Sequence, residues 1–246
     1  MNNNYISWVN DVHSSFEDFL NDENINLLNQ IYETIKDSDY TPDAENVLRF
    51  LSNDLSKIKV VIMGQDPYFS VVNGRKVATG RAYEPADVTD FRMKFKQVSL
   101  KNIIRLIHKN YHGITDYDKI LKFSEIQAEI DCGRFNINYP KAWFDSLERQ
   151  GVLMLNSSLT TLINQPLAHE KLWHEFTLRL LQYIDRDHVI IYFLWGKSAM
   201  AYQGLLKGKV YTSRHPMMCA EKYADDFLKC DCFLDTMDII DWLGNV

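Results

Sequence analysis

Four short runs of apolar residues are spaced along this chain, and each ends in a polar or glycine-containing turn. They lie within residues 60–68, 152–156, 189–196 and 210–216. The first run is rich in β-branched residues and too short for an amphipathic helix, so the pattern predicts strands. Runs that are apolar throughout are typical of parallel strands buried on both faces of a sheet.

Helix-period patterns separate the four predicted strands. Apolar positions recur at helical spacing in residues 100–108, 142–150, 173–184 and 224–243. Strands that alternate with helices predict an α/β fold with a parallel sheet. The carboxyl ends of such strands meet at one edge, where open α/β sheets bind ligands. We therefore expect Asp66, Asn156, the Trp195–Gly196 turn and His215 to line one crevice.

Length and composition favour one compact domain. The chain has 246 residues, 46% of them hydrophobic, which suffices for a full core. The first 16 residues lack a basic and an apolar signal region, and no segment reaches the 18 or so apolar residues of a membrane span. We expect a soluble, cytoplasmic monomer with no membrane association.

The cysteines and three partial motifs argue against metal and nucleotide chemistry. Four irregularly spaced cysteines predict reduced thiols without zinc or an iron–sulfur cluster. Gly196-Lys197-Ser198 resembles the end of a phosphate-binding loop, but Ile191 stands where that loop needs glycine. His169 and His174 are five residues apart and would not share a helix face as zinc ligands do. No dinucleotide-binding glycine motif is present, and we expect no metal and no cofactor.

Charge is unevenly distributed along the chain, although the net charge is −6. Residues 92–109 hold six cations and no acid, with aromatic and aliphatic residues between them, which predicts contacts to a phosphate backbone. The six are Arg92, Lys94, Lys96, Lys101, Arg105 and Lys109. The last predicted helix, 224–243, is rich in Asp and is expected to face away from DNA.

Several motifs, in order along the chain, resemble those of family 1 uracil-DNA glycosylases. Residues 64–68 (GQDPY) resemble the family's water-activating motif, 151–160 its base-reading strand and 215–216 (HP) the start of its leucine loop. Supporting matches lie at residues 78–83, 99–103, 173–177 and 193–196. The resemblance covers about residues 45–243.

The resemblance implies a fold and a domain organisation. The implied fold is a three-layer α/β/α sandwich around a four-stranded parallel sheet. The chain, 1–246, would form a single glycosylase-like domain, with residues 1–44 as a helical N-terminal extension and residues 112–140 as an insertion.

The same resemblance assigns roles to individual side chains. Asp66 would position water and stabilise the sugar cation, and His215 would donate a hydrogen bond to the leaving base. The base pocket is implied for Gln65, Tyr68, Tyr83 and Asn156, with Asn156 reading the base edge, Tyr83 stacking on the ring and Tyr68 excluding the methyl group of thymine. DNA contacts are implied for Ser99, Lys101, Gly196, Lys197, Ser198, Pro216, Met217, Met218 and Cys219.

Departures from the family pattern lie in segments expected to touch DNA. Phe69 replaces the usual histidine, the basic segment replaces a proline-rich loop, and Cys219 aligns with the wedging leucine, for which Met217 or Met218 could substitute. Three hypotheses follow: excision of uracil from single- or double-stranded DNA in base excision repair, the same chemistry on a modified pyrimidine as an anti-phage defence, or an inactive DNA- or partner-binding relative. A proteinaceous glycosylase inhibitor is a further possible partner.

Overall fold

The computed structural model describes residues 7–9, 11–186 and 189–246. Its central sheet has the order β5-β2-β7-β8, and all three pairings are parallel. The strands are β2 (Val60–Gly64), β5 (Val152–Asn156), β7 (Ile191–Trp195) and β8 (Lys209–Ser213). Two two-stranded antiparallel sheets pair β1 (Tyr40–Thr41) with β6 (Thr161–Leu162), and β3 (Val71–Val72) with β4 (Arg75–Lys76).

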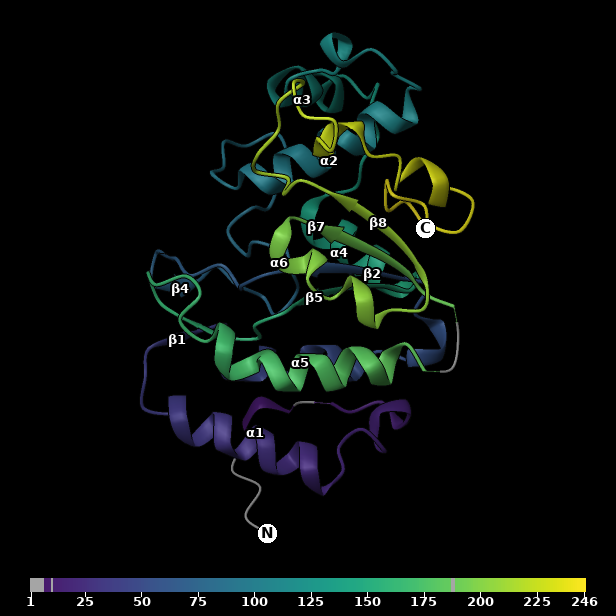
Figure 1. The fold of residues 1–246 in the computed structure, drawn as a ribbon. Helices are drawn as coiled ribbons and strands as arrows, with labels where there is room; N and C mark the ends of the chain where they lie inside the picture. The colour runs from purple at the N-terminus through teal and green to yellow at the C-terminus, as the bar shows by residue number, and fades with distance from the viewer. Residues whose placement is uncertain (1–6, 10, 187–188) are drawn as a thin grey trace.

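Helices cover both faces of the central sheet (Figure 1). The α-helices are α1 (Asp22–Ile35), α2 (Val98–Tyr111), α3 (Phe123–Asp131), α4 (Pro140–Arg149), α5 (Glu170–Ile184) and α6 (Lys197–Met200). Short 3-10 helices lie at Ser14–Phe16, Ala44–Asn46, Arg49–Ser52, Leu55–Lys57, Tyr117–Lys119, Gln203–Leu205, Phe227–Lys229 and Leu234–Thr236. None of the helices in the described part of the chain has the length and apolar character that crossing a bilayer requires.

Alternation along the strands divides the core into two layers. Val60 and Ile62 of β2 pack with α2 and α4 on one face, whereas Val61 and Met63 pack with α1 and α5 on the other. All five residues of β2 are buried, as the continuous apolar run predicts. The predicted three-layer α/β/α sandwich with four parallel strands is confirmed.

The N-terminal segment belongs to one of these core layers. Trp8 is fully buried, lies 5.7 Å from Trp173 of α5 between ring centroids, and donates from Nε1 to the Tyr40 hydroxyl (3.0 Å). Helix α1 is capped by Asn21, whose side chain accepts from the Asn24 N–H, and buries one apolar face against the same layer.

The prediction of one helix over residues 224–243 is wrong. That segment contains the two short 3-10 helices Phe227–Lys229 and Leu234–Thr236, joined by turns. Asp226 accepts from the Leu228 N–H (2.9 Å), and Asp241 accepts from the Leu243 N–H (3.0 Å). Local side-chain acceptors of this kind compete with the helical ladder, and the sequence has aspartates at close intervals.

Candidate active site

The carboxyl ends of the parallel strands surround a cavity of about 300 Å³. Its lining includes Asp66 after β2, Asn156 at the end of β5, and His215 after β8. The structure therefore brings together the three side chains that the strand-end argument placed in one crevice. The complete lining is Gly64, Gln65, Asp66, Pro67, Tyr68, Phe69, Arg81, Tyr83, Ser99, Asn156, Pro166, Leu167 and His215.

Asp66 is held at the cavity by backbone contacts on both sides of it. The turn that carries Asp66 is tied to the end of β5, because the Gly64 and Gln65 carbonyls accept from the N–H groups of Ser157 and Ser158 (both 2.9 Å). One carboxylate oxygen, Oδ2, accepts from the N–H of Leu167. The other, Oδ1, is buried and has no hydrogen-bond partner. Oδ1 can therefore accept a further hydrogen bond, although the Ser158 and Thr161 side chains lie near enough to lower the pKa of the carboxyl.

Burial sets the charge state of Asp66. Loss of solvent raises the pKa of the Asp66 carboxyl above its ordinary value; the Leu167 N–H opposes the rise, and the negative charge of Glu170 adds to it. In its ionised form this carboxylate is poorly solvated. Such a group interacts strongly with a cation that forms beside it.

Asn156 is buried and lies against the backbone of the neighbouring strand. A Cβ atom at Gly64 would stand 2.3 Å from Asn156 Oδ1, so only glycine at this position leaves room for the amide. Tyr83 has a positive φ of 63° and donates from its hydroxyl to the Met63 carbonyl (3.3 Å). Its ring lies 5.7 Å from that of Trp195 and 6.4 Å from that of His215. An amide edge and a fixed aromatic ring thus share one pocket.

His215 is oriented by its own loop. Its Nδ1 accepts from the Met217 N–H (3.2 Å), which leaves the proton of the neutral ring on Nε2. Burial lowers the pKa of His215 below its ordinary value, so the ring is neutral at pH 7. Gly196, at φ +89°, lets the ring lie close, since a Cβ there would be 3.0 Å from His215 Cβ. His215 can therefore donate one hydrogen bond without carrying a charge.

The loop after His215 is anchored from beneath and exposed at its tip. Asn102 donates to the Pro216 carbonyl (2.6 Å), and buried Asp226 accepts from the Ala220 N–H (2.5 Å). Met217 and Met218 are more than half exposed, at 58% and 54%. Cys219 is half-buried, and its Sγ lies 3.3 Å from the Pro216 carbonyl. The two exposed methionines are therefore better placed than Cys219 to insert between DNA bases.

The remaining predicted contacts lie around the same opening. Ser99 lines the cavity from the first turn of α2, and the Lys101 ammonium lies 5.1 Å above the Phe95 ring. Gly196, Lys197 and Ser198 form the start of α6, and Lys197 is exposed. Gln65 lines the cavity, but its side-chain amide donates to Glu170 (3.4 Å).

The basic segment is only partly available for phosphate. Arg92 pairs with Asp90 (2.6 Å), and buried Lys109 pairs with Asp231 (2.9 Å). The prediction of six cations without a counter-charge is therefore wrong for these two, because folding brings carboxylates from outside the segment. Asp226 of the Asp-rich C-terminal segment is buried and anchors the loop after His215, and the orientation of that segment away from DNA stays a prediction.

Two residues at the cavity received no role from the sequence. Leu167 has a positive φ of 65° and positions Asp66 through its backbone N–H, a function that side-chain identity does not reveal. Arg81 is buried and bonded to Glu84, Asp145 and Glu148, which fixes the wall beside Tyr83. A buried arginine with several acids nearby could have been suspected only from the fold.

Comparison with known proteins agrees with this geometry. No family model matches the chain. A uracil-DNA glycosylase of Lachnoclostridium phytofermentans is 31% identical over 198 residues, 76% of this chain and 74% of the relative. A uracil-DNA glycosylase of Bacillus subtilis is 30% identical over 212 residues, 85% of this chain and 77% of the relative. The chain belongs to the uracil-DNA glycosylase family.

Solved structures share the fold of this family member. The glycosylase of Nitratifractor salsuginis aligns with a TM-score of 0.64 at 22% identity, covering 84% of this chain and 85% of that one. A mimivirus glycosylase variant in complex with the inhibitor UGI aligns with a TM-score of 0.61 at 24% identity, covering 86% of this chain and 74% of that one. The family prediction and the fold prediction are confirmed.

Proposed function

We propose that this chain is an active uracil-DNA glycosylase, which hydrolyses the N-glycosidic bond of a flipped-out uracil and leaves an abasic site. The observation that carries this proposal is the unpartnered Oδ1 of Asp66 in a cavity shared with neutral His215. An inactive DNA- or partner-binding protein would have no use for a desolvated carboxylate opposite a neutral hydrogen-bond donor.

In this proposal each side chain at the cavity has a separate role in the reaction. A flipped uracil enters between Tyr83 and Tyr68, and the Asn156 amide pairs with its edge. As the glycosidic bond breaks, positive charge develops on the sugar and negative charge on the base. The Asp66 carboxylate stabilises the sugar cation and orients water through Oδ1, while His215 Nε2–H donates to the base oxyanion. Neutral His215 can donate this bond and keep its proton.

We expect the exposed residues around the cavity to contact DNA. Met217 and Met218 stand at the tip of an anchored loop and are suited to fill the space left by a flipped nucleotide. Lys101 is two residues after the cavity-lining Ser99 on α2, and exposed Lys197 follows Gly196, which lies against His215. Cytoplasmic location, a monomeric state and binding of a protein inhibitor stay predictions, as does the alternative of a modified pyrimidine.

Base release from defined oligonucleotides tests the proposal. Asp66→Asn should abolish release of uracil while DNA binding is retained, and His215→Ala should slow it about 10²- to 10³-fold, as expected for removal of one oxyanion donor. Exposed His174→Gln provides a control for replacement of a histidine away from the cavity. Parallel substrates with uracil, hydroxymethyluracil and glucosylated hydroxymethylcytosine separate the two substrate hypotheses. Unchanged turnover in Asp66→Asn would refute the assignment.

A further inference from the structure

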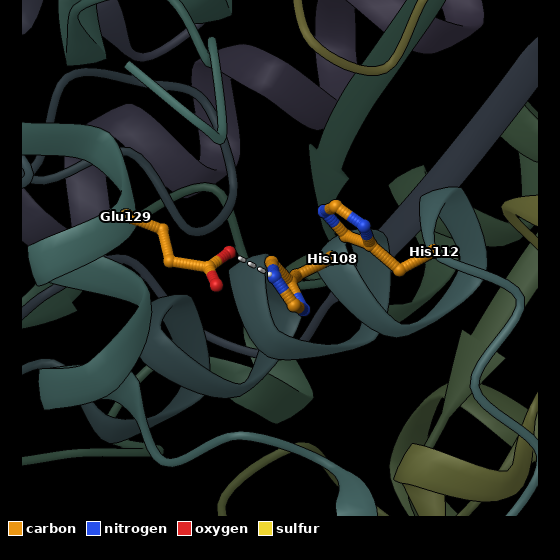
Figure 2. A group of neighbouring side chains, drawn as sticks. All are labelled: His108, His112 and Glu129. Carbon is orange, nitrogen blue, oxygen red and sulfur yellow. Dashed lines mark hydrogen bonds and ion pairs between the residues drawn. The ribbon is translucent and has the colours of Figure 1, made fainter. Parts of the chain in front are cut away.

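A cluster of three potential metal ligands lies outside the cavity, between α2 and α3. His108 lies in the last turn of α2, His112 is the C-cap of that helix, and Glu129 faces them from α3 (Figure 2). Each residue offers one ligand atom, and these atoms all lie within 4.8 Å of one another. None of the three lines the cavity that holds Asp66.

The distances between these groups suit a small divalent cation. His108 Nε2 lies 2.8 Å from Glu129 Oε2, and the two imidazole rings are 4.2 Å apart between centroids. Ligands of tetrahedral Zn²⁺ at about 2.0–2.2 Å from the metal stand roughly 3.3–3.5 Å from one another. Rotation of exposed His112 and a small separation of the His108–Glu129 pair would reach that geometry.

The contact with Glu129 does not satisfy the whole ring of buried His108. The His108 side chain is 3% exposed, and its Nδ1 is buried without a hydrogen-bond partner. A simple ion pair with Glu129 occupies only Nε2, so it leaves this nitrogen unexplained.

Neighbouring side chains form an outer shell of the kind that metal sites have. The ring of buried Phe135 lies 5.0 Å from that of His108 and 6.2 Å from that of His112. Arg134 lies 3.8 Å from Glu129 Oε1, the carboxylate oxygen that does not contact His108. An apolar cover and a second partner for the carboxylate would restrict the orientation of the ligands.

We propose that His108, His112 and Glu129 bind one Zn²⁺ ion, with water in the fourth position. Two neutral imidazoles and one carboxylate match the ligand preferences of this metal. The ion would join the inserted segment 112–140 to α2, whose first turn carries Ser99 at the cavity. Its two histidines are four residues apart at the end of α2, unlike His169 and His174, which are five apart.

Zinc titration of the untagged full chain, freed of metal with a chelator, tests this proposal. Calorimetry should show one Zn²⁺ per chain in the wild type. His112→Gln and Glu129→Gln should each weaken binding by at least about 100-fold, more than removal of an outer-shell partner alone. Both variants retain a polar side chain at a site that is not fully buried. The control His174→Gln, an exposed histidine on α5, should bind as the wild type does.

Two further readouts locate the metal and its effect. Free Zn²⁺ at about 100 times its Kd should raise the Tm of the wild type by roughly 5–10 °C and leave that of His112→Gln nearly unchanged. Co²⁺ in place of Zn²⁺ should give four-coordinate visible bands without sulfur charge transfer. Absence of binding, equal binding by His112→Gln, or a thiolate band that places the metal on Cys230 and Cys232 would each overturn the proposal.

Discussion

Tyr68 stands at the wall of the cavity, where a hydroxyl-to-carbonyl hydrogen bond to Tyr83 (3.3 Å) fixes its ring. If this ring excludes the C5 methyl group of thymine, Tyr68→Ala should raise the ratio of thymine to uracil release. The expected rise is roughly 10- to 200-fold, the discrimination that one methyl group in a pocket supplies. Competing single-turnover assays on otherwise identical duplexes measure this ratio.

Tyr68→Phe separates the ring from its hydroxyl. The phenylalanine keeps the bulk of the ring but cannot make the hydrogen bond to Tyr83, so the ratio should stay near that of the wild type. An equal change in both variants would mean that the hydrogen bond, and not the ring, determines selectivity.

At the scale of single residues, sequence reasoning predicted which side chains share the cavity better than it predicted the contacts that position them. Asp66, Asn156 and His215 follow three parallel strands, so topology alone brings them together. The contacts that position them come from Leu167, Gly196 and Asp226, far away in sequence or acting through the backbone. Such contacts depend on loop conformation, which apolar periodicity does not encode.

Helix α5 contributes to the site through its first residue, Glu170. The folded-state pKa of Asp66 is raised, so the carboxylate takes up a proton as the pH falls, at a pH above that of an ordinary aspartate. Because the ionised form is required, kcat/KM should decline on the acid side as Asp66 is protonated. Glu170→Gln removes a negative charge, lowers the pKa of Asp66, and should move this decline to lower pH by a few tenths of a unit, since the exposed charge is screened.

The pH profile of kcat/KM for uracil release measures that movement. Glu175→Gln, one turn further along α5 and paired with Arg179 (2.8 Å), removes the same charge away from the cavity and should leave the profile in place. An identical profile for wild type and Glu170→Gln would exclude the proposed influence of Glu170 on Asp66.

At the scale of elements, the sequence correctly predicted the strands and helices whose apolar positions are set by burial in the core. The strands β2 and β5 and the helices α2, α4 and α5 follow their apolar patterns closely. The single helix predicted for residues 224–243 does not form, because its aspartates accept hydrogen bonds from nearby N–H groups and end each helical turn early. The His108–His112–Glu129 cluster was not predicted, since its third member comes from another helix.

The whole molecule is acidic, with a net charge of −6, so DNA affinity must depend on a local distribution of cations. In the basic segment, Arg92 and Lys109 are paired with carboxylates, whereas Lys94 and Lys96 are exposed next to the turn of α2 that lines the cavity. Replacing Lys94, Lys96 and Lys101 with glutamine should weaken duplex binding for all sequences alike. It should also reduce the slope of log K against log salt by up to about 0.9 for each phosphate that the chain no longer neutralises.

A matched variant shows whether the position of the lysines or the total charge of the chain determines the salt dependence of DNA binding. Lys36, Lys57 and Lys59 are partly or largely exposed, and Lys57 and Lys59 lie before β2, at the opposite edge of the sheet from the cavity. Their replacement with glutamine makes the same change in net charge, but the salt slope should stay at the wild-type value because the cations that neutralise phosphates remain in place. Equal slopes for the two triple variants would indicate that the chain binds DNA through another surface, and segment 112–140 would then be the next surface to neutralise.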